Sequence, residues 1–260
     1  MKSSFPCKTP LAAAISAALA STLAFSQNST PDDDQLEEIV VVSKATTYAN
    51  NAITDSMKLQ NSSITSINNF IDNLPGVSVH EGDAFGFDDW STAITVRGFQ
   101  TNLAEQQVGS TIDGLPNGNS NYGGGAKANR YIDTANLQTI EVSQGTADIS
   151  SRSLEALGGT LNYVTSDPTL DQRVRLEYVS GQYDAQRFYA RYDSGLIGSS
   201  TRFYVSASHQ EATDWMEGSA ENERDHLAAK LVTGSDQLRF TAYVSYDDIH
   251  EDNYQRVYSE

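Results

Sequence analysis

The second half of the chain alternates apolar and polar residues with a period of two. Val174, Leu176 and Tyr178 alternate with charged neighbours in the first run, and the same alternation recurs farther along the chain. The later runs lie at residues 187–193, 202–208, 227–231 and 238–247, and residues 211–224 are expected to form a longer loop between two of them. A period of two places apolar side chains on one face of a strand and polar side chains on the other. Residues 169–260 are therefore predicted to form about five antiparallel strands, either in a soluble sheet or in a transmembrane barrel.

The region before these strands, residues 50–168, shows a different pattern. Apolar residues recur at helical spacing over residues 63–74, and the Pro-Gly pair that follows predicts the end of a helix. Short strands are predicted at residues 77–80, 93–97, 109–112, 139–142 and 160–165. Asp113 and Gly114 form an Asp-Gly pair, which is a strong signal for a hairpin. This region is predicted to be a mixed α+β domain.

The first residues have the features of a secretory signal peptide. Lys2 and Lys8 precede an uncharged apolar run at residues 11–25, and small residues follow before a polar segment. The run is shorter than the roughly 20 residues that a membrane-spanning helix needs. We expect residues 1–26 to be removed on export and residues 27–49 to form a flexible leader, which is polar and acidic at its start.

Composition narrows the classes of function. The chain has 34 acidic against 17 basic residues and a net charge of −17, which argues against nucleic acid as a partner. Its mean hydropathy of −0.44 suits a barrel, in which only every second residue faces lipid. The single cysteine, Cys7, lies in the predicted signal peptide, so no disulfide or thiolate metal site is expected in the mature chain. Common hydrolase and zinc-site motifs are absent, and we expect no enzyme activity, no cofactor and no metal.

Four short motifs follow one another in a fixed order. They are an acidic and valine-rich stretch at residues 37–43, Leu-Pro-Gly-Val at 74–77, Ile-Thr-Val-Arg-Gly-Phe at 94–99, and Glu-Val-Ser-Gln-Gly at 141–145 with Gly-Gly-Thr-Leu-Asn-Tyr-Val-Thr at 158–165. In this order and spacing they resemble the TonB box and plug domain of TonB-dependent outer-membrane receptors. The resemblance implies an α+β plug domain at residues 50–168, followed at 169–260 by antiparallel β-strands of an incomplete transmembrane β-barrel.

The valine-rich stretch is the part that the resemblance identifies as the TonB box. It comprises Glu38, Ile39, Val40, Val41, Val42 and Ser43. A β-branched segment on a flexible leader is able to add itself to the edge of a partner's sheet through backbone hydrogen bonds. The resemblance implies that the partner is TonB or a TonB-like energy transducer. The alternative is an ordinary edge strand of the domain.

Five motif positions are expected to seat the plug. They are Arg97, Gly98, Gly145, Gly158 and Gly159. Arg97 is expected to pair with a barrel carboxylate, because buried arginines are normally paired. In the alternative interpretation its guanidinium reaches a ligand oxygen. The glycines are expected to allow tight backbone geometry.

Two long loops, residues 81–91 and 117–130, combine aromatic, acidic and amide side chains. The resemblance implies that such plug loops help to form the pocket for a small-molecule ligand, whose aromatic and polar groups suit a bulky chelate. The candidate ligand-binding residues in and near these loops are Phe85, Phe87, Asp88, Trp90, Gln100, Asn117, Asn121 and Tyr122. The alternative is that the loops pack against the barrel wall.

The resemblance implies a receptor in the outer membrane of a Gram-negative bacterium, in contact with outer-membrane lipid, that imports a scarce solute. The first expectation for the ligand is a ferric siderophore or other iron chelate. A vitamin or oligosaccharide importer, a free-standing periplasmic plug-like binding module and a degenerate remnant remain alternatives. About five strands fit after Pro168, whereas barrels of this kind have about 22, so we expect a fragment that does not transport alone.

Overall fold

A computed structural model describes most of the chain after the predicted leader. The described residues are 49–61, 65–82, 85–86, 92–102, 105–117, 127–145, 148–153, 156–213, 221–235 and 237–252. All of them belong to one compact unit, Ala45–Glu260. The predicted signal peptide lies outside the described residues. None of the described helices is long and apolar enough to cross a membrane.

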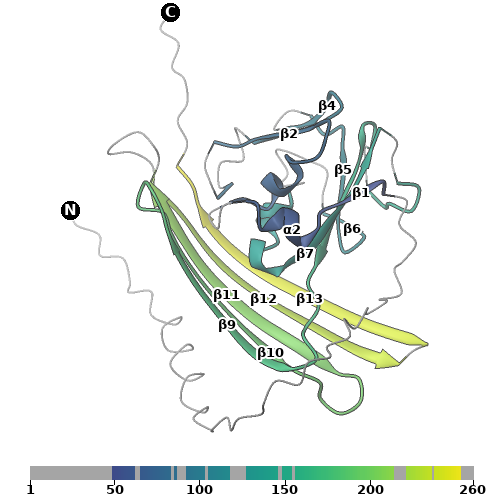
Figure 1. The fold of residues 1–260 in the computed structure, drawn as a ribbon, viewed down its shortest axis with the longest axis vertical. Helices are drawn as coiled ribbons and strands as arrows, with labels where there is room; N and C mark the ends of the chain where they lie inside the picture. Colours follow the sequence, from purple (N-terminus) through teal and green to yellow (C-terminus); the bar gives the residue numbers. More distant parts are fainter. Residues whose placement is uncertain are drawn as a thin grey trace, which may run out of the picture. The chain divides into compact units, whose positions relative to one another are not determined.

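The second half of the chain forms five antiparallel strands that lie side by side, which we call the strand wall (Figure 1). The strands are β9 (Gln172–Ser180), β10 (Gln186–Ser194), β11 (Arg202–Thr213), β12 (Glu221–Ser235) and β13 (Leu238–His250). Each strand pairs with the next one along the chain, so the order is β9-β10-β11-β12-β13. The wall is an open sheet with β9 and β13 at its edges. The prediction of antiparallel strands from the period-two pattern is confirmed.

Strands β11 and β12 are longer than their hydropathy suggests. The sequence predicts a loop over residues 211–224, but β11 runs to Thr213 and β12 begins at Glu221, with these two residues paired. That part of the prediction is wrong. The paired ends of both strands carry polar side chains on both faces. The alternation of apolar and polar residues therefore disappears from the sequence there, although the backbone pairing continues. Hydrogen bonding between strands does not depend on side-chain polarity, which is why the pairing extends beyond the apolar part.

The mixed domain contains two small sheets. The first has the order β1-β7-β8-β5-β6, in which β5 and β8 are parallel, and the second has the order β2-β3-β4. The strands are β1 (Asn51–Ala52), β2 (Val77–His80), β3 (Ala93–Val96), β4 (Phe99–Thr101), β5 (Gly109–Ile112), β6 (Leu115–Pro116), β7 (Leu137–Gln144) and β8 (Gly159–Thr165). Asp113 and Gly114 both have positive φ between β5 and β6, which is the geometry of the predicted Asp-Gly hairpin.

The helical content differs from the prediction. The expected helix over residues 63–74 is reduced, within the described part, to a 3₁₀ turn at Asn68–Ile71. Two further 3₁₀ turns lie at Ala128–Arg130 and Thr134–Asn136. Instead, a short helix α2 (Asp55–Lys58) forms where the sequence suggested irregular structure, and the side chain of Thr54 caps it by accepting a hydrogen bond from the N–H of Met57.

The apolar residues of the 63–74 segment nevertheless form the core that their spacing predicts. Ile67, Phe70, Ile71 and Leu74 are buried in one cluster with residues of the sheets. The cluster also includes Val77, Val96, Val108, Ile132, Ile140, Val142, Leu161 and Tyr163. Within the segment, the backbone N–H of Asn68 donates to Oγ of Ser66 at 3.0 Å instead of to a helical carbonyl. Such side-chain hydrogen bonds compete with regular helix.

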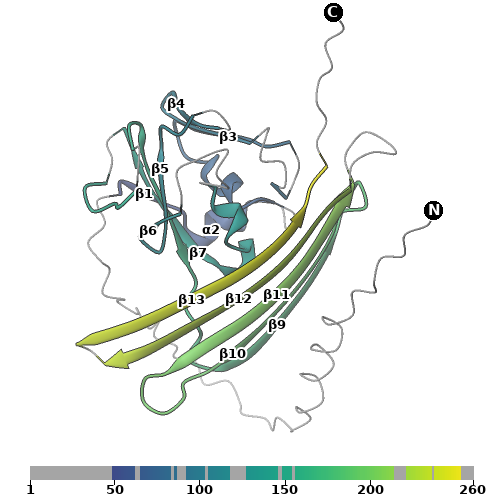
Figure 2. The same cartoon turned by 180° about the vertical axis from the view of Figure 1, so that it is seen from behind.

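The strand wall buries its polar face and exposes its apolar face. On β10, Arg187, Tyr189, Arg191 and Asp193 are buried, while the apolar residues between them are partly exposed. Both views place the mixed domain on the inner side of the curved sheet (Figure 1, Figure 2). The contacts described below join that domain to the buried polar face.

Candidate functional site

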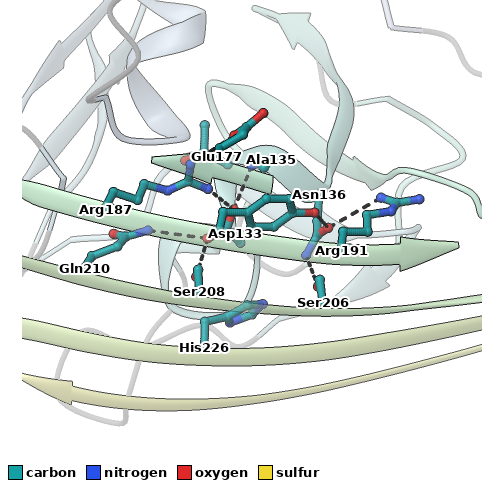
Figure 3. A network of polar contacts seen from close by, with 12 residues as sticks. Asp133, Ala135, Asn136, Glu177, Arg187, Arg191, Ser206, Ser208, Gln210 and His226 are labelled. Atoms are coloured by element: carbon teal, nitrogen blue, oxygen red, sulfur yellow. Dashed lines mark hydrogen bonds and ion pairs between the residues drawn. The ribbon is translucent and has the colours of Figure 1, made fainter. Parts of the chain in front are cut away.

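Asp133 lies at the centre of a polar network between the mixed domain and the strand wall (Figure 3). It precedes the 3₁₀ turn Thr134–Asn136, and its Oδ1 accepts a hydrogen bond from the N–H of Ala135 at 2.8 Å. The wall supplies three further donors, Nη2 of Arg187 on β10 at 2.6 Å, Oγ of Ser208 on β11 at 2.7 Å and, more distantly, Nε2 of Gln210 on β11 at 3.4 Å. The carboxylate has no solvent exposure, so these partners replace the water that it would otherwise bind.

The electrostatics keep Asp133 charged. Burial alone would raise the pKa of its carboxyl, because a low-dielectric environment disfavours the charged form. The charge of Arg187 lowers the pKa, and His226 adds to that effect. The hydrogen bond from Ser208 and the charge of Arg224 lower it further, and the pKa falls from 3.8 to about 2. Asp133 is therefore ionised at physiological pH.

Asn136 continues the network along the same turn (Figure 3). Its Nδ2 donates to Oγ of Ser206 on β11 at 2.8 Å, and its Oδ1 accepts from the hydroxyl of Tyr189 on β10 at 2.7 Å. Arg191 on β10 donates through Nη2 to the backbone oxygen of Asp167 at 2.9 Å. The turn that Asp133 begins thus presents a second polar side chain to the wall.

Guanidinium groups stack on buried tyrosines of the wall. The guanidinium of Arg187 lies 5.2 Å from the ring centroid of Tyr189, and that of Arg175 lies 5.6 Å from it. Arg191 lies 3.8 Å from the ring centroid of Tyr204. Cations over aromatic faces are attracted by the ring quadrupole. The rings therefore hold these arginines in place while Arg187 and Arg191 donate to the mixed domain and Arg175 pairs with Glu177 on its own strand.

A second polar cluster lies around Lys230 on β12. Its Nζ donates to the backbone oxygen of Thr165 at 3.0 Å and to the hydroxyl of the same residue at 2.8 Å. The Nζ is also 3.1 Å from Oδ1 of Asp167, which pairs in addition with Arg202 and Arg239. Burial alone would raise the pKa of Asp167, but Lys230 and Arg239 outweigh it and lower the pKa. Carboxylates of the mixed domain again meet cations of the wall.

His226 extends the polar face along β12. It is buried, and its Nδ1 lies 2.9 Å from Oδ1 of Asp247 on β13. Arg224 donates to the same carboxylate oxygen through Nε at 2.7 Å. Within the described part of the chain, Nε2 of His226 has no hydrogen-bond partner. The charged surface thus continues across the wall beyond the residues that touch Asp133.

We call the contacts around Asp133, Asn136 and Lys230 the polar seam. A hydrogen bond contributes only about 1 kcal/mol net between neutral groups and about 1.5–3 kcal/mol when one group is charged, because the same groups bind water when they separate. The polar seam therefore fixes the position of the mixed domain as long as water is excluded from the seam. If water enters, the same groups have alternative partners, so the domain is able to detach without exposing a large apolar surface. This arrangement suits a reversible attachment more than a permanent core.

Comparison with known proteins agrees with this architecture. The sequence model of the TonB-dependent Receptor Plug Domain matches residues 25–160, which is more than half of the chain. The chain belongs to the TonB-dependent receptor plug family. The mixed domain is hereafter called the plug. A comparison with curated proteins finds no match.

Solved structures share the fold at low sequence identity. The ferripyoverdine receptor of the outer membrane of Pseudomonas aeruginosa, bound to ferripyoverdine, is 20% identical with a TM-score of 0.60, over 76% of this chain and 25% of that one. The ferric yersiniabactin uptake receptor FyuA from Yersinia pestis is 17% identical with a TM-score of 0.56, over 76% and 31%. The ferric-catecholate import receptor Fiu from E. coli K12 is 20% identical with a TM-score of 0.58, over 77% and 27%. The chain thus spans about a quarter to a third of the length of these receptors.

The structure gathers the predicted seating residues at one place in the plug. Arg97 is exposed, and a Cβ on Gly145 would lie 2.9 Å from its Nη1, so the two are in close contact. The N–H of Gly145 in turn donates to the backbone oxygen of Gly158 at 2.9 Å. Gly98, next to Arg97, has a φ of +91°. Among the described residues Arg97 forms no ion pair with the wall, and its pairing with a barrel carboxylate stays a prediction.

Two adjacent glycines are required by close packing. A Cβ on Gly159 would lie 2.1 Å from the backbone oxygen of Ser143, and the φ of Gly159 is +138°. A Cβ on Gly158 would lie 2.1 Å from Cβ of Phe99. Neither position has room for a larger residue, so the Gly-Gly pair sets how closely β8 approaches β7 and β4.

The seam itself was missed by the sequence analysis. The sequence predicted that a plug arginine, Arg97, pairs with a wall carboxylate. In the seam the charges are reversed, because plug carboxylates pair with wall cations. The sequence does contain a signal, because Arg187, Arg191 and Lys230 all lie at polar positions of alternating strands. Nothing in the sequence indicated that Asp133 is their partner, because residues 131–137 show no regular pattern.

The predicted ligand residues fall into three groups. Phe85 is buried and packs with Ala185, against Ala212 and Ile249 of the wall, as in the alternative interpretation of loop packing. Gln100 lies exposed on β4, and Asn117 directly follows β6. The remaining candidates Phe87, Asp88, Trp90, Asn121 and Tyr122 lie outside the described residues. So do the six residues of the predicted TonB box, 38–43.

Proposed function

We propose that this chain is part of an outer-membrane receptor that imports a scarce solute with energy from TonB or a TonB-like transducer, and that it does not transport alone. The observation that carries the proposal is the polar seam, which holds a plug of the TonB-dependent receptor family against the polar face of a strand wall. A plug that is attached through exchangeable polar contacts is suited to displacement when its leader is pulled. Membership of the plug family supports transport, not catalysis, as the role of the chain.

The outward face of the wall supports a place in a membrane. Val174, Leu176 and Tyr178 on β9 are each more than 60% exposed, and so are Val244 and Tyr246 on β13. An exposed apolar face of this extent is unfavourable in water but favourable in lipid. Every second residue of these strands is apolar, as in strands that cross an outer membrane. We therefore propose that this face contacts outer-membrane lipid, after export through the signal peptide.

For the ligand, we propose a ferric siderophore or other iron chelate. The solved structures named above are described as receptors for ferripyoverdine, ferric yersiniabactin and ferric catecholates, which supports this choice. The loops at residues 81–91 and 117–130, together with Gln100 on β4, remain our candidates for the ligand pocket; besides Phe85, the described candidates are Gln100 and Asn117. Phe85 is better assigned to holding its loop against the wall, because its side chain is already enclosed there.

The test separates ligand binding from energised import. Val41→Pro removes a backbone N–H from the proposed TonB box, and proline disrupts an added strand. Gln35→Pro places the same residue in the leader outside the box, as a control. In a strain that depends on this gene, we expect Val41→Pro to abolish uptake of radioactive iron chelate while surface binding is kept. Gln35→Pro should leave both unchanged.

Two results would contradict parts of the proposal. If uptake persists in Val41→Pro and in a strain without the transducer, the energised mechanism is wrong. If no ferric chelate is taken up, but a vitamin or an oligosaccharide is, then the receptor function stands and the ligand assignment is wrong.

A further inference from the structure

Acidic and imidazole side chains gather on the outward face of the wall, just beyond its apolar part. On β11 they are His209 and Glu211, and on β12 they are Glu223 and Asp225. The register pairs His209 with Asp225 and Glu211 with Glu223 directly across the two strands. One pair nearer the middle of the strands, the outward residues become apolar, with Ala207 opposite Leu227. The cluster therefore lies where the two strands leave the apolar face, at the end opposite the short turn between β12 and β13.

Like charges face one another in this cluster. Glu211 lies opposite Glu223, and on the next strand Asp225 lies opposite Asp248 of β13. Like charges directly across an antiparallel pair destabilise it. By the alternation of the strands, no lysine or arginine occupies an outward position of the described residues of β11, β12 and β13. Two imidazoles, that of His209 and that of His250 opposite Glu223, are fewer than these four carboxylates and do not balance them.

Three donor atoms converge at the centre of the cluster. One ring nitrogen of His209 and one carboxylate oxygen each from Glu223 and Asp225 all lie within 4.8 Å of one another. Nδ1 of His209 is 2.9 Å from Oδ1 of Asp225, and both side chains are more than a third exposed. Atoms at this mutual spacing are able to bind one ion after small rotations of the side chains. The backbone on both sides is a continuous ladder, so the donors are held on a rigid support.

We propose that His209, Glu223 and Asp225 form a binding site for a divalent transition-metal ion that joins β11 to β12. An imidazole with two carboxylates suits Zn²⁺ or Mn²⁺, whereas Mg²⁺ and Ca²⁺ prefer oxygen ligands alone. The ion neutralises the like-charged pairs and adds a cross-link between the strands. The site itself follows from the wall alone, while its position at the membrane boundary rests on the proposed function.

The experiment uses the full chain in detergent, with Zn²⁺ alone as the probe. We expect calorimetry to show saturable binding of one ion per chain and Co²⁺ to give the absorption bands of a nitrogen-containing site. His209→Gln and Asp225→Asn should each weaken binding at least tenfold. Asp171→Asn, an exposed carboxylate near the start of β9, is the matched control and should bind like the parent chain. Circular dichroism of each sample verifies that the strands are formed.

A stability measurement adds a readout that does not depend on affinity. In the presence of a chelator, Glu223→Gln should raise the melting temperature or leave it unchanged, because it removes a like-charge pair. In the presence of Zn²⁺, the parent chain should gain stability and Glu223→Gln should gain much less.

Several results would overturn the site. Folded parent chain without saturable Zn²⁺ binding, or binding that the His209 and Asp225 variants leave intact, would contradict it. Tighter binding of Ca²⁺ than of Zn²⁺ would show that the imidazole is not a ligand. If the parent chain binds Zn²⁺ but the gene supports no import, only the proposed function is contradicted. If the gene supports import but the parent chain does not bind Zn²⁺, only the metal site is contradicted.

Discussion

Removing the carboxylate of Asp133 should loosen the attachment of the plug to the strand wall. Asp133→Ala removes the nearer charged partner of Arg187, at 2.6 Å, and leaves its buried guanidinium only the more distant Glu177, at 3.3 Å. It also removes the acceptor for the hydroxyl of Ser208 and for the N–H of Ala135. Breaking a buried ion pair by removing one partner typically costs about 3–5 kcal/mol. At 1.4 kcal/mol for each factor of ten, the open form of the seam should become roughly two to three orders of magnitude more populated.

Hydrogen exchange measures this opening directly. The N–H of Asn136 donates to the backbone oxygen of Asp133 at 2.9 Å, an acceptor that the substitution leaves in place, so its exchange rate reports on the seam. We expect faster exchange over residues 127–137 in Asp133→Ala and no change in Asp171→Ala, whose side chain is exposed. Adding Arg187→Met to Asp133→Ala should recover part of the loss, because no buried charge is then left unpaired. An increase in exchange of less than tenfold would show that water replaces the carboxylate, and would refute the reasoning.

Acid should open the same seam. The pKa of Asp133 is depressed from 3.8 to about 2 in the folded protein, so its contribution to stability is fully present above about pH 4. The contribution is lost as the pH falls through about 2 and is on the order of 2 kcal/mol. The opening that exchange at Asn136 reports should therefore rise between pH 4 and pH 2 in the parent chain. In Asp133→Asn the exchange rate should show no such rise between pH 4 and pH 2. A rise of equal size in this variant would show that another titrating group causes the opening.

Three further substitutions test other parts of the structure. Gly159→Ala should destabilise the plug by more than 2 kcal/mol in thermal unfolding, because its Cβ would meet a backbone oxygen at 2.1 Å, whereas Gly198→Ala has open space and should cost about 1 kcal/mol. Lys230→Met should cost about 3 kcal/mol in denaturant unfolding, because Asp167 loses a buried partner; a neutral result would mean that its other partners suffice. Phe85→Ala should cost about 3 kcal/mol and speed exchange at its loop, and loss of ligand binding with unchanged exchange would instead make Phe85 a ligand contact.

Local sequence was sufficient for those features that depend on neighbours along the chain. The period-two alternation placed Val174 and Leu176 on one face and Arg187 and Arg191 on the other, because successive side chains of a strand point in opposite directions. The Asp-Gly pair at 113–114 located a hairpin, because both positions of that turn need positive φ. Motif order was sufficient to indicate the plug family, which the match to residues 25–160 shows.

Tertiary structure decided which residues meet. Asp133 and Arg187 are 54 positions apart, and Lys230 and Thr165 are 65 apart, so no local pattern pairs them. The segment at 63–74 had a helical pattern, but its described part is a short turn whose polar residues Ser66, Asn68 and Asn69 bond to the distant Glu81. The ends of β11 and β12 looked like a loop, yet the ladder between them continues to Thr213 and Glu221. Periodicity therefore determined which face of the sheet each side chain occupies. The partner of each side chain depended on how the plug packs against the wall. The physical reason is that a buried charged group is stable only where the tertiary structure brings an opposite charge close to it.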